Sequence, residues 1–238
     1  MLRLTKNVTL IFAIAVFVAG CSSKNNVTGP NSSAPQLKAP QFHGPVSTSS
    51  SADTSLGART AVSTAALFDG ISAGFMAYYA GSGTQSGNSW TWSSTENGIT
   101  GVWTATSASS GYSWKLVLNG SSGNTSYNNW TALTGSESSD GKSGNWTLYY
   151  LNSSEPEFAA SWSTDSNGNL TGTILVYNTS GALTAKEIFT NNTDNSGELK
   201  IYTGATLTLD IKWIANGSGT WVEYDPTSGA EINSGSWS

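Results

Sequence analysis

The sequence predicts a mostly β protein, in which about twelve strands form an antiparallel meander that makes a barrel or half-barrel, with one N-terminal helical segment. Three observations predict this fold class. Apolar and polar residues alternate from Asn88 onward, clusters of Gly, Asn, Asp and Ser separate the alternating runs, and aromatic residues are as abundant as charged ones, at 11% each. Disordered chains have few aromatic residues and many charges, so the composition is that of an exported sheet protein with many turns.

The first element is a secretory signal. Residues 1–20 begin with two basic residues, Arg3 and Lys6, and continue into an apolar run over 8–19. This run is too short to cross a bilayer comfortably, and the order of charged and apolar residues is typical of a signal peptide. We therefore expect residues 1–20 to be removed on export.

The signal ends in Val18-Ala19-Gly20-Cys21, which resembles the lipobox of bacterial lipoproteins, where small residues precede a cysteine that is lipidated and becomes the mature N-terminus. The resemblance covers this segment only and assigns no family to the rest of the chain. It implies lipidation of Cys21, a membrane as partner through the N-terminal lipid, and localisation at the cell envelope. Ser22 follows the cysteine in place of Asp, which in that family favours the outer membrane.

Residues 21–57 are expected to hold the lipidated cysteine and a flexible tether. They are rich in Ser, Pro and Asn and lack a periodic apolar pattern. His43, the one histidine, lies in this stretch, where a solvated side chain is the expected state. The folded part is then a single β-rich domain over 58–238.

The stretch from Arg59 to Tyr79 predicts the helical segment, because its apolar residues recur every three or four positions and so share one helical face. These residues are Ala61, Ala65, Phe68, Ile71, Phe75 and Tyr79. Gly70 and Gly74 weaken the helix, and the part from Gly74 onward could instead be a first strand. We expect the segment to lie against or inside the sheet.

A weak repeat marks the C-terminal half of the chain. Four glycines are each followed two residues later by an apolar residue and five residues later by Tyr; they are Gly144, Gly172, Gly197 and Gly219. This unit predicts a hairpin in which Gly opens the strand, the apolar residue enters the core, and Tyr lies on the other face just before the turn. The spacing between copies is uneven, so the repeat does not predict a strict solenoid.

Residue counts exclude several chemistries. One Cys and one His cannot build a zinc site, a disulfide or a Ser-His-Asp triad in the folded domain, so no metal, cofactor or catalytic residue is expected. A net charge of −5 without clustered Lys and Arg argues against nucleic acid. Three polar stretches are better explained as turns or loops than as a phosphate loop, a carboxylate pair or a calcium site: Asp140-Gly141-Lys142-Ser143, Glu155 with Glu157, and Asp165-Ser166-Asn167-Gly168-Asn169.

The ten tryptophans are the most informative residues. Most are expected to fill the sheet interior, since large rings are needed where no helix covers a face. Two functional alternatives remain, an aromatic-lined cavity for an apolar ligand and an exposed platform for sugars. The candidate ligand-binding residues are Trp90, Trp92, Trp114, Trp130 and Trp237. Trp130 and Trp237 fall out of phase with their neighbours and are the better candidates for an exposed site.

These features predict a lipid-anchored, non-catalytic cell-envelope lipoprotein that binds an apolar or amphipathic ligand or has a structural role. In outline the fold is similar to the half-barrel carriers of lipids and lipoproteins, a likeness at fold level that transfers no binding residues. The alternative is a glycan-binding or adhesive surface module that uses exposed aromatic residues. A membrane-spanning barrel shows the same alternation, but the lipobox, the tether and the short turns disfavour it. The patterns define no oligomeric state.

Overall fold

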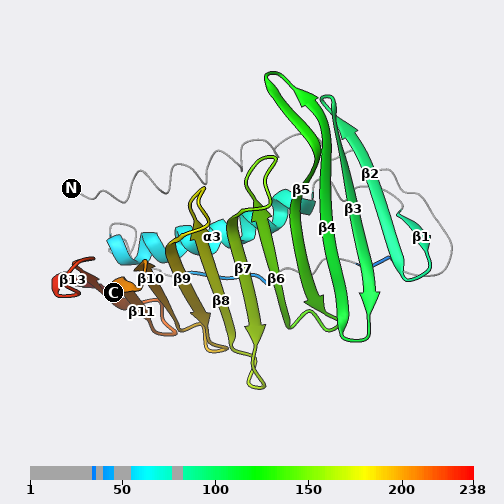
Figure 1. Cartoon of the computed structure of the whole chain (residues 1–238). Helices are drawn as coiled ribbons and strands as arrows, with labels where there is room; N and C mark the ends of the chain where they lie inside the picture. The colour runs from blue at the N-terminus through cyan, green and yellow to red at the C-terminus, as the bar shows by residue number, and fades with distance from the viewer. Residues whose placement is uncertain (1–33, 36–39, 46–54, 77–82) are drawn as a thin grey trace.

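The computed structural model describes residues 34–35, 40–45, 55–76 and 83–238. In these residues one helix lies on one face of a single sheet, whose thirteen antiparallel strands follow one another in chain order (Figure 1). The two edge strands, β1 and β13, do not pair with each other, so the sheet is an open half-barrel. The predicted β meander with an N-terminal helix is confirmed. The predicted signal peptide, Cys21 and most of the predicted tether lie outside the described residues.

The elements have the following bounds. The helix is α3 (Leu56–Met76), and the strands are β1 (Thr84–Ser86), β2 (Ser89–Glu96), β3 (Ile99–Ala108), β4 (Gly111–Ser122), β5 (Thr125–Ser138), β6 (Ser143–Tyr149), β7 (Pro156–Thr164), β8 (Leu170–Tyr177), β9 (Leu183–Asn191), β10 (Gly197–Thr203), β11 (Thr206–Trp213), β12 (Gly219–Tyr224) and β13 (Glu231–Trp237).

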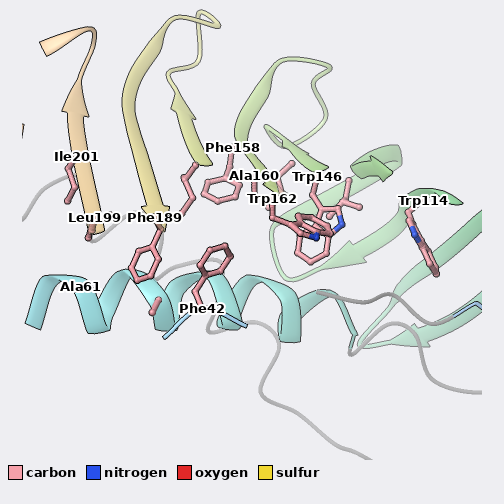
Figure 2. Close-up of a cluster of buried hydrophobic side chains, with 14 of the residues drawn as sticks. Phe42, Ala61, Trp114, Trp146, Phe158, Ala160, Trp162, Phe189, Leu199 and Ile201 are labelled. Atoms are coloured by element: carbon pink, nitrogen blue, oxygen red, sulfur yellow. The ribbon is translucent and has the colours of Figure 1, made fainter. Parts of the chain in front are cut away.

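Side chains alternate between an inner face, which carries α3, and an outer face. In β3, Ile99, Gly101, Trp103 and Ala105 are buried on the inner face, and the residues that alternate with them are half-buried on the outer face. Residues directly opposite one another on paired strands share a face, so the inner face can be followed from strand to strand. Figure 2 shows inner-face side chains of several strands, such as Trp146 and Phe158, gathered on the side of the sheet that faces the helix.

The helix lies close to the sheet because small residues line its contact side. Ala58, Ala61 and Ala65 are buried. Gly57 lies against β12, where an added Cβ would come within 2.8 Å of Cδ1 of Trp221. A larger residue at these positions would therefore push the helix away from the strands.

The bounds of α3 differ slightly from the prediction. The helix begins at Leu56, three residues before the predicted start at Arg59, and is described as far as Met76, while residues 77–79 of the predicted segment lie outside the described residues. Residues 74–76 are helical, so the alternative first strand from Gly74 does not form there. The burial of Ala61 and Ala65 confirms the first part of the predicted apolar face. The other predicted members of that face lie outside the described side chains.

Residues 40–45 correct the predicted tether. Phe42 is only 3% exposed and meets Phe189 edge-on at 5.4 Å between ring centroids. The N–H group of His43 donates to Oδ1 of Asn191 at 3.0 Å, and Nδ2 of Asn191 donates back to the His43 carbonyl at 2.7 Å. This short segment is therefore docked on the inner face of β8 and β9. Periodicity cannot reveal such docking, because it depends on one ring and on backbone groups.

A recurring glycine–aromatic pair gives the weak repeat its physical basis. Each repeat glycine stands directly opposite an aromatic residue of the next strand, in the pairs Gly144 with Trp162, Gly172 with Phe189, Gly197 with Trp213, and Gly219 with Trp237. In three pairs an added Cβ on the glycine would overlap the indole ring, and at Gly172 it would overlap Phe42 instead. Phe42 thus covers the glycine of the one pair, or rung, in which Phe replaces Trp. The repeat therefore reflects the packing of an aromatic ring over a glycine on the neighbouring strand.

The same three tryptophans also hold the neighbouring turns. Nε1–H of Trp162 donates to the Gly141 carbonyl at 3.3 Å, and that of Trp213 donates to the Asn195 carbonyl at 3.1 Å. These carbonyls belong to the turns just before Gly144 and Gly197. Each indole therefore covers the glycine on the strand before its own and bonds to the turn that precedes that strand, so side chains as well as the backbone ladder link consecutive strands.

Candidate binding surface on the outer face

The structure places three of the predicted ligand-binding tryptophans in or beside the core. Trp92 and Trp114 are 3% and 2% exposed and stack on each other on the inner face, with ring centroids 6.2 Å apart. Trp90 is half-buried on the same face and meets Tyr112 edge-on at 6.3 Å. These rings fill the interior, which is the arrangement expected for most of the ten.

Trp237 and Trp130 behave differently from each other. The prediction that Trp237 belongs to an exposed site is wrong, because it is 5% exposed and its Nε1–H donates to the Gly217 carbonyl at 2.6 Å. Its ring is buried because it covers Gly219 on β12. Trp130 is half-buried, stacks on Tyr127 at 5.9 Å between centroids, and borders a polar hollow.

This hollow is open to solvent and has a volume of about 640 Å³. Its strand residues come from β4, β5 and β6 and lie mainly on the outer face, and its remaining wall is the turn between β6 and β7. The lining residues are Lys115, Asn128, Asn129, Trp130, Thr131, Thr134, Tyr149, Asn152, Ser153 and Ser154. The lining therefore combines amide, hydroxyl and ammonium groups with the outer-face ring of Tyr149, a combination that fits a polar ligand with hydroxyl groups.

An irregular stretch of β5 forms one side of the hollow. The register between β4 and β5 shifts twice, between Leu116 and Val117 and between Leu118 and Gly120. Asn129 has a left-handed backbone (φ 47°), which Asn tolerates better than most residues. Its N–H group donates to Oδ1 of Asn119 at 3.2 Å, so a side chain replaces the missing ladder bond. Bulges re-aim side chains, and Asn128 and Asn129 of this irregular stretch line the hollow.

Asn152 connects the β6–β7 turn to this irregular stretch. Its backbone is also left-handed, with φ 54°. Its Oδ1 accepts the N–H group of Asn128 at 3.3 Å, and its Nδ2 donates to the Ser126 carbonyl at 2.8 Å. One side chain thus satisfies two backbone groups of β5 and fixes the wall of the hollow.

The floor of the hollow carries an exposed cation and a hydroxyl pair. Lys115 stands opposite Thr134, and Oγ1 of Thr134 lies 2.8 Å from the hydroxyl of Tyr149. In the part of the chain that the structure describes, the salt bridges involve Lys200 and Lys212 and do not include Lys115. The Lys115 ammonium is therefore available as a hydrogen-bond donor to a ligand.

Sequence reasoning missed most of this site, although one signal was present. Asn128 and Asn129 are two consecutive polar residues between Tyr127 and Trp130, and they interrupt the period of two. Such an interruption in a strand indicates a bulge. The contribution of Asn152 could not be found from local patterns, because it depends on a turn that meets a strand 24 to 26 residues away.

Glu155 and Glu157, the two carboxylates weighed from the sequence, are not among the residues that line this hollow. Glu157 lies on β7 and not in a loop, as had been expected, and its burial raises the pKa of its carboxyl. The pKa of Tyr150 is raised by burial and by the nearby Glu157. Asp165 forms a turn, as predicted, because its Oδ1 accepts the N–H groups of Asn167 and Asn169 at 2.8 and 2.9 Å.

Two further searches give simple results. Among the residues that the structure describes, no group of His, Cys, Asp and Glu could hold a metal ion. No helix within the described ranges is long and apolar enough to cross a membrane. Comparison with known proteins adds no assignment: no family model matches the chain, and no curated protein matches its sequence.

Proposed function

We propose that this protein is a lipid-anchored, non-catalytic module of the bacterial cell envelope that binds a glycan at the outer-face hollow. The observation that carries the proposal is the lining of the hollow, which combines asparagine amides, hydroxyls, the Lys115 ammonium and the Tyr149 ring. A sugar presents hydroxyl groups around an apolar ring face. Amides and hydroxyls can bond to the former, and an aromatic ring can stack on the latter.

The inner face supports this choice over an apolar ligand. A carrier of lipids needs an open cavity lined by its aromatic residues. The described inner-face rings instead cover glycines, stack on one another, or lie under α3 and Phe42. Most of the described aromatic residues that an apolar ligand would use are therefore already in contact with other parts of the protein.

The proposed location rests on the segment that ends at Cys21. Acyl chains on this cysteine would hold the domain at a bilayer, since each buried CH₂ contributes about 0.8 kcal/mol. We expect mass spectrometry of protein extracted from host membranes to show a lipidated N-terminal Cys21. A Cys21→Ser variant is expected to leave the membrane fraction, and an unmodified Cys21 in the extracted protein would contradict the anchor.

The glycan proposal is tested with full-length protein in detergent micelles on a glycan array. Lys115→Ala and Asn152→Ala are expected to weaken binding about tenfold or more, because each removes a polar contact or the wall that positions one. The matched controls are Lys142→Ala and Asn216→Ala, in exposed turns at the opposite rim of the sheet. Equal losses in variants and controls, or no binding to any arrayed glycan, would overturn the proposal.

A second candidate, an apolar ligand, is favoured by one region only. Strands β2–β4 lie beyond the end of the described helix (Figure 1), and Trp90 and Tyr112 are half-buried there. Native mass spectrometry of the purified protein tests this candidate. A copurifying lipid that is lost in Trp90→Ala, together with a negative glycan array, would favour the apolar ligand.

A further inference from the structure

Four tyrosines form a row on the outer face, named here the tyrosine row: Tyr149, Tyr177, Tyr202 and Tyr224. They stand at or next to the last residue of β6, β8, β10 and β12. Alternate strands of a meander run in the same direction, so all four reach the same rim of the sheet. Each follows its inner-face repeat residue by three positions, which places its side chain on the outer face.

A break in strand register accompanies every member of the row. The pairing with the next strand shifts between Leu148 and Tyr149, between Val176 and Tyr177, between Ile201 and Tyr202, and between Glu223 and Tyr224. Each shift leaves one extra residue on the next strand, which is the definition of a β-bulge. Bulges re-aim side chains and are found next to functional sites. Because a bulge accompanies each of the four equivalent tyrosines, the bulges are a regular feature of the repeat and not a local irregularity.

Two of the bulges are closed by the same hydrogen bond. Thr184 Oγ1 donates to the Val176 carbonyl at 3.0 Å, and Thr208 Oγ1 donates to the Ile201 carbonyl at 3.0 Å. In each case the carbonyl belongs to the residue just before the tyrosine. The backbone that carries the ring is thereby held by a side chain where the ladder bond is missing.

The row is continuous with the hollow. Tyr149, its first member, lines the hollow. Neighbouring strands lie 4.7 to 4.9 Å apart, so tyrosines on every second strand are spaced at roughly 10 Å, and the four span roughly 30 Å. All four are half-buried, so their backbones are fixed while part of each ring is open to solvent.

The charges on the outer face are of both signs, and the cations Lys200 and Lys212 are paired with Glu198 and Asp210. Lys186 Nζ lies 4.2 Å from the centroid of the Tyr202 ring. Glu157 is the extra residue of the bulge opposite Tyr149. A polyanion would need clustered cations, which this surface does not offer.

We propose that the hollow and the tyrosine row form one track for an extended, uncharged polysaccharide that lies across the strands, with sugar rings stacked on successive tyrosines. This inference rests on the proposed glycan-binding function and deepens it by naming the ligand class. It predicts that affinity grows with chain length, because a longer chain reaches more rings.

The test uses full-length protein in detergent micelles and β-1,4-linked N-acetylglucosamine, glucose and mannose oligomers from disaccharide to octasaccharide, with calorimetry as the readout. Affinity is expected to rise along a series up to the octasaccharide. The double variant Tyr202→Ala with Tyr224→Ala is expected to lower octasaccharide affinity about tenfold or more and to leave disaccharide affinity unchanged, at roughly fivefold per ring. Tyr202→Phe with Tyr224→Phe is expected to retain binding, since stacking needs the ring and not the hydroxyl.

The outcomes separate the track from the hollow. Binding that depends on Asn152 but neither grows with length nor responds to Tyr202→Ala with Tyr224→Ala overturns the track and leaves the hollow as the site. Tighter binding of anionic oligomers than of neutral ones overturns the uncharged ligand. No binding to any oligomer or arrayed glycan overturns both proposals. Ile214→Ala, a change of an exposed residue at the opposite rim, and thermal melting of each variant control for folding.

Discussion

The two faces of the sheet carry the same alternation but use their aromatic residues in opposite ways. On the inner face three indoles, those of Trp162, Trp213 and Trp237, each lie directly opposite a glycine on the preceding strand and donate the ring N–H to a turn carbonyl, so these rings are enclosed. On the outer face each tyrosine of the row stands at a bulge and stays half-buried. The alternation with a period of two therefore determines the face of the sheet on which an aromatic ring lies. The residue opposite the ring on the neighbouring strand determines whether the ring is buried in the core or remains accessible to a ligand.

The largest effect is expected from removing one indole of the inner face. Trp213→Ala deletes a ring that is 2% exposed, uncovers Gly197 and leaves the Asn195 carbonyl without its indole partner. Truncation of a buried Trp costs about 3 to 5 kcal/mol. Urea denaturation followed by far-UV circular dichroism measures it. A loss of unfolding free energy below about 1 kcal/mol would show that the inner-face ring contributes no more to stability than an outer-face ring.

A smaller loss is expected at the rung where Phe replaces Trp. Phe42→Ala should destabilise the fold by about 3 kcal/mol, because the ring fills the space above Gly172 and meets Phe189. Gln41→Ala, at the exposed neighbouring position, is the matched control. Limited proteolysis within 40–45 should accelerate in Phe42→Ala only, and equal cleavage of both variants would show that the ring does not hold the segment.

Glu187 on β9 tests the inner face through pH. Its Oε2 atom is buried without a hydrogen-bond partner in the described structure, and burial raises the pKa of this carboxyl to about 7, opposed by a hydrogen bond with Thr64 of α3. The native state thus holds a proton between about pH 4.5 and pH 7 that the unfolded chain releases, so stability falls as pH rises through this window and is level above it.

Replacing this carboxyl should remove the pH dependence. Glu187→Gln is expected to raise the free energy of unfolding at pH 8 by about 2 kcal/mol and to flatten the profile between pH 4.5 and 7. Denaturation at a series of pH values measures both. The control is Glu231→Gln on the exposed start of β13, which should leave the profile unchanged. An unchanged slope in Glu187→Gln would assign the pH dependence to other groups.

The smallest effect on stability is expected on the outer face. Tyr202→Ala removes a half-buried ring and its contact with Lys186, which should cost about 1 kcal/mol or less. Trp213 lies on the adjacent strand and on the opposite face of the sheet, so the difference in unfolding free energy between Tyr202→Ala and Trp213→Ala compares the two faces most directly. A cost as large as that of Trp213→Ala would mean that the tyrosine row is structural.

The fold class could be predicted from the sequence because its determinants are local. Alternating runs such as the one from Leu207 to Trp213 specify strands, and the Asn, Asp and Gly clusters specify the turns between them. The open form of the sheet could not be predicted, because curvature accumulates from the register of many pairs. The glycine–aromatic pairing behind the repeat could not be predicted either, since the tryptophan that covers Gly197 lies 16 residues later on the next strand.

The candidate site was much less predictable than the fold. Trp130 and Trp237 were both singled out because they are out of phase with their neighbours. Trp237 is buried, because phase does not show that Gly219 lies beneath its ring, and Trp130 packs half-buried against the core opposite Leu118. Asn152 acts through backbone groups of a distant strand. Phe42 lies in a stretch without periodicity, so no local pattern predicts its burial. It is buried because Phe189 stands where the other pairs have Trp, and the Phe42 ring fills the space over Gly172.

The glycine–indole pair also bears on how this chain can change in length. Each indole lies on the strand that follows its glycine, so two consecutive strands that begin with an indole strand and end with a glycine strand carry half of the contact with each neighbour. An inserted pair of this kind would complete both contacts without altering the rest of the sheet. Every such copy would add one tyrosine to the outer face. Gene duplication within the repeat would therefore lengthen the core and the outer row together, by two strands and one ring at a time.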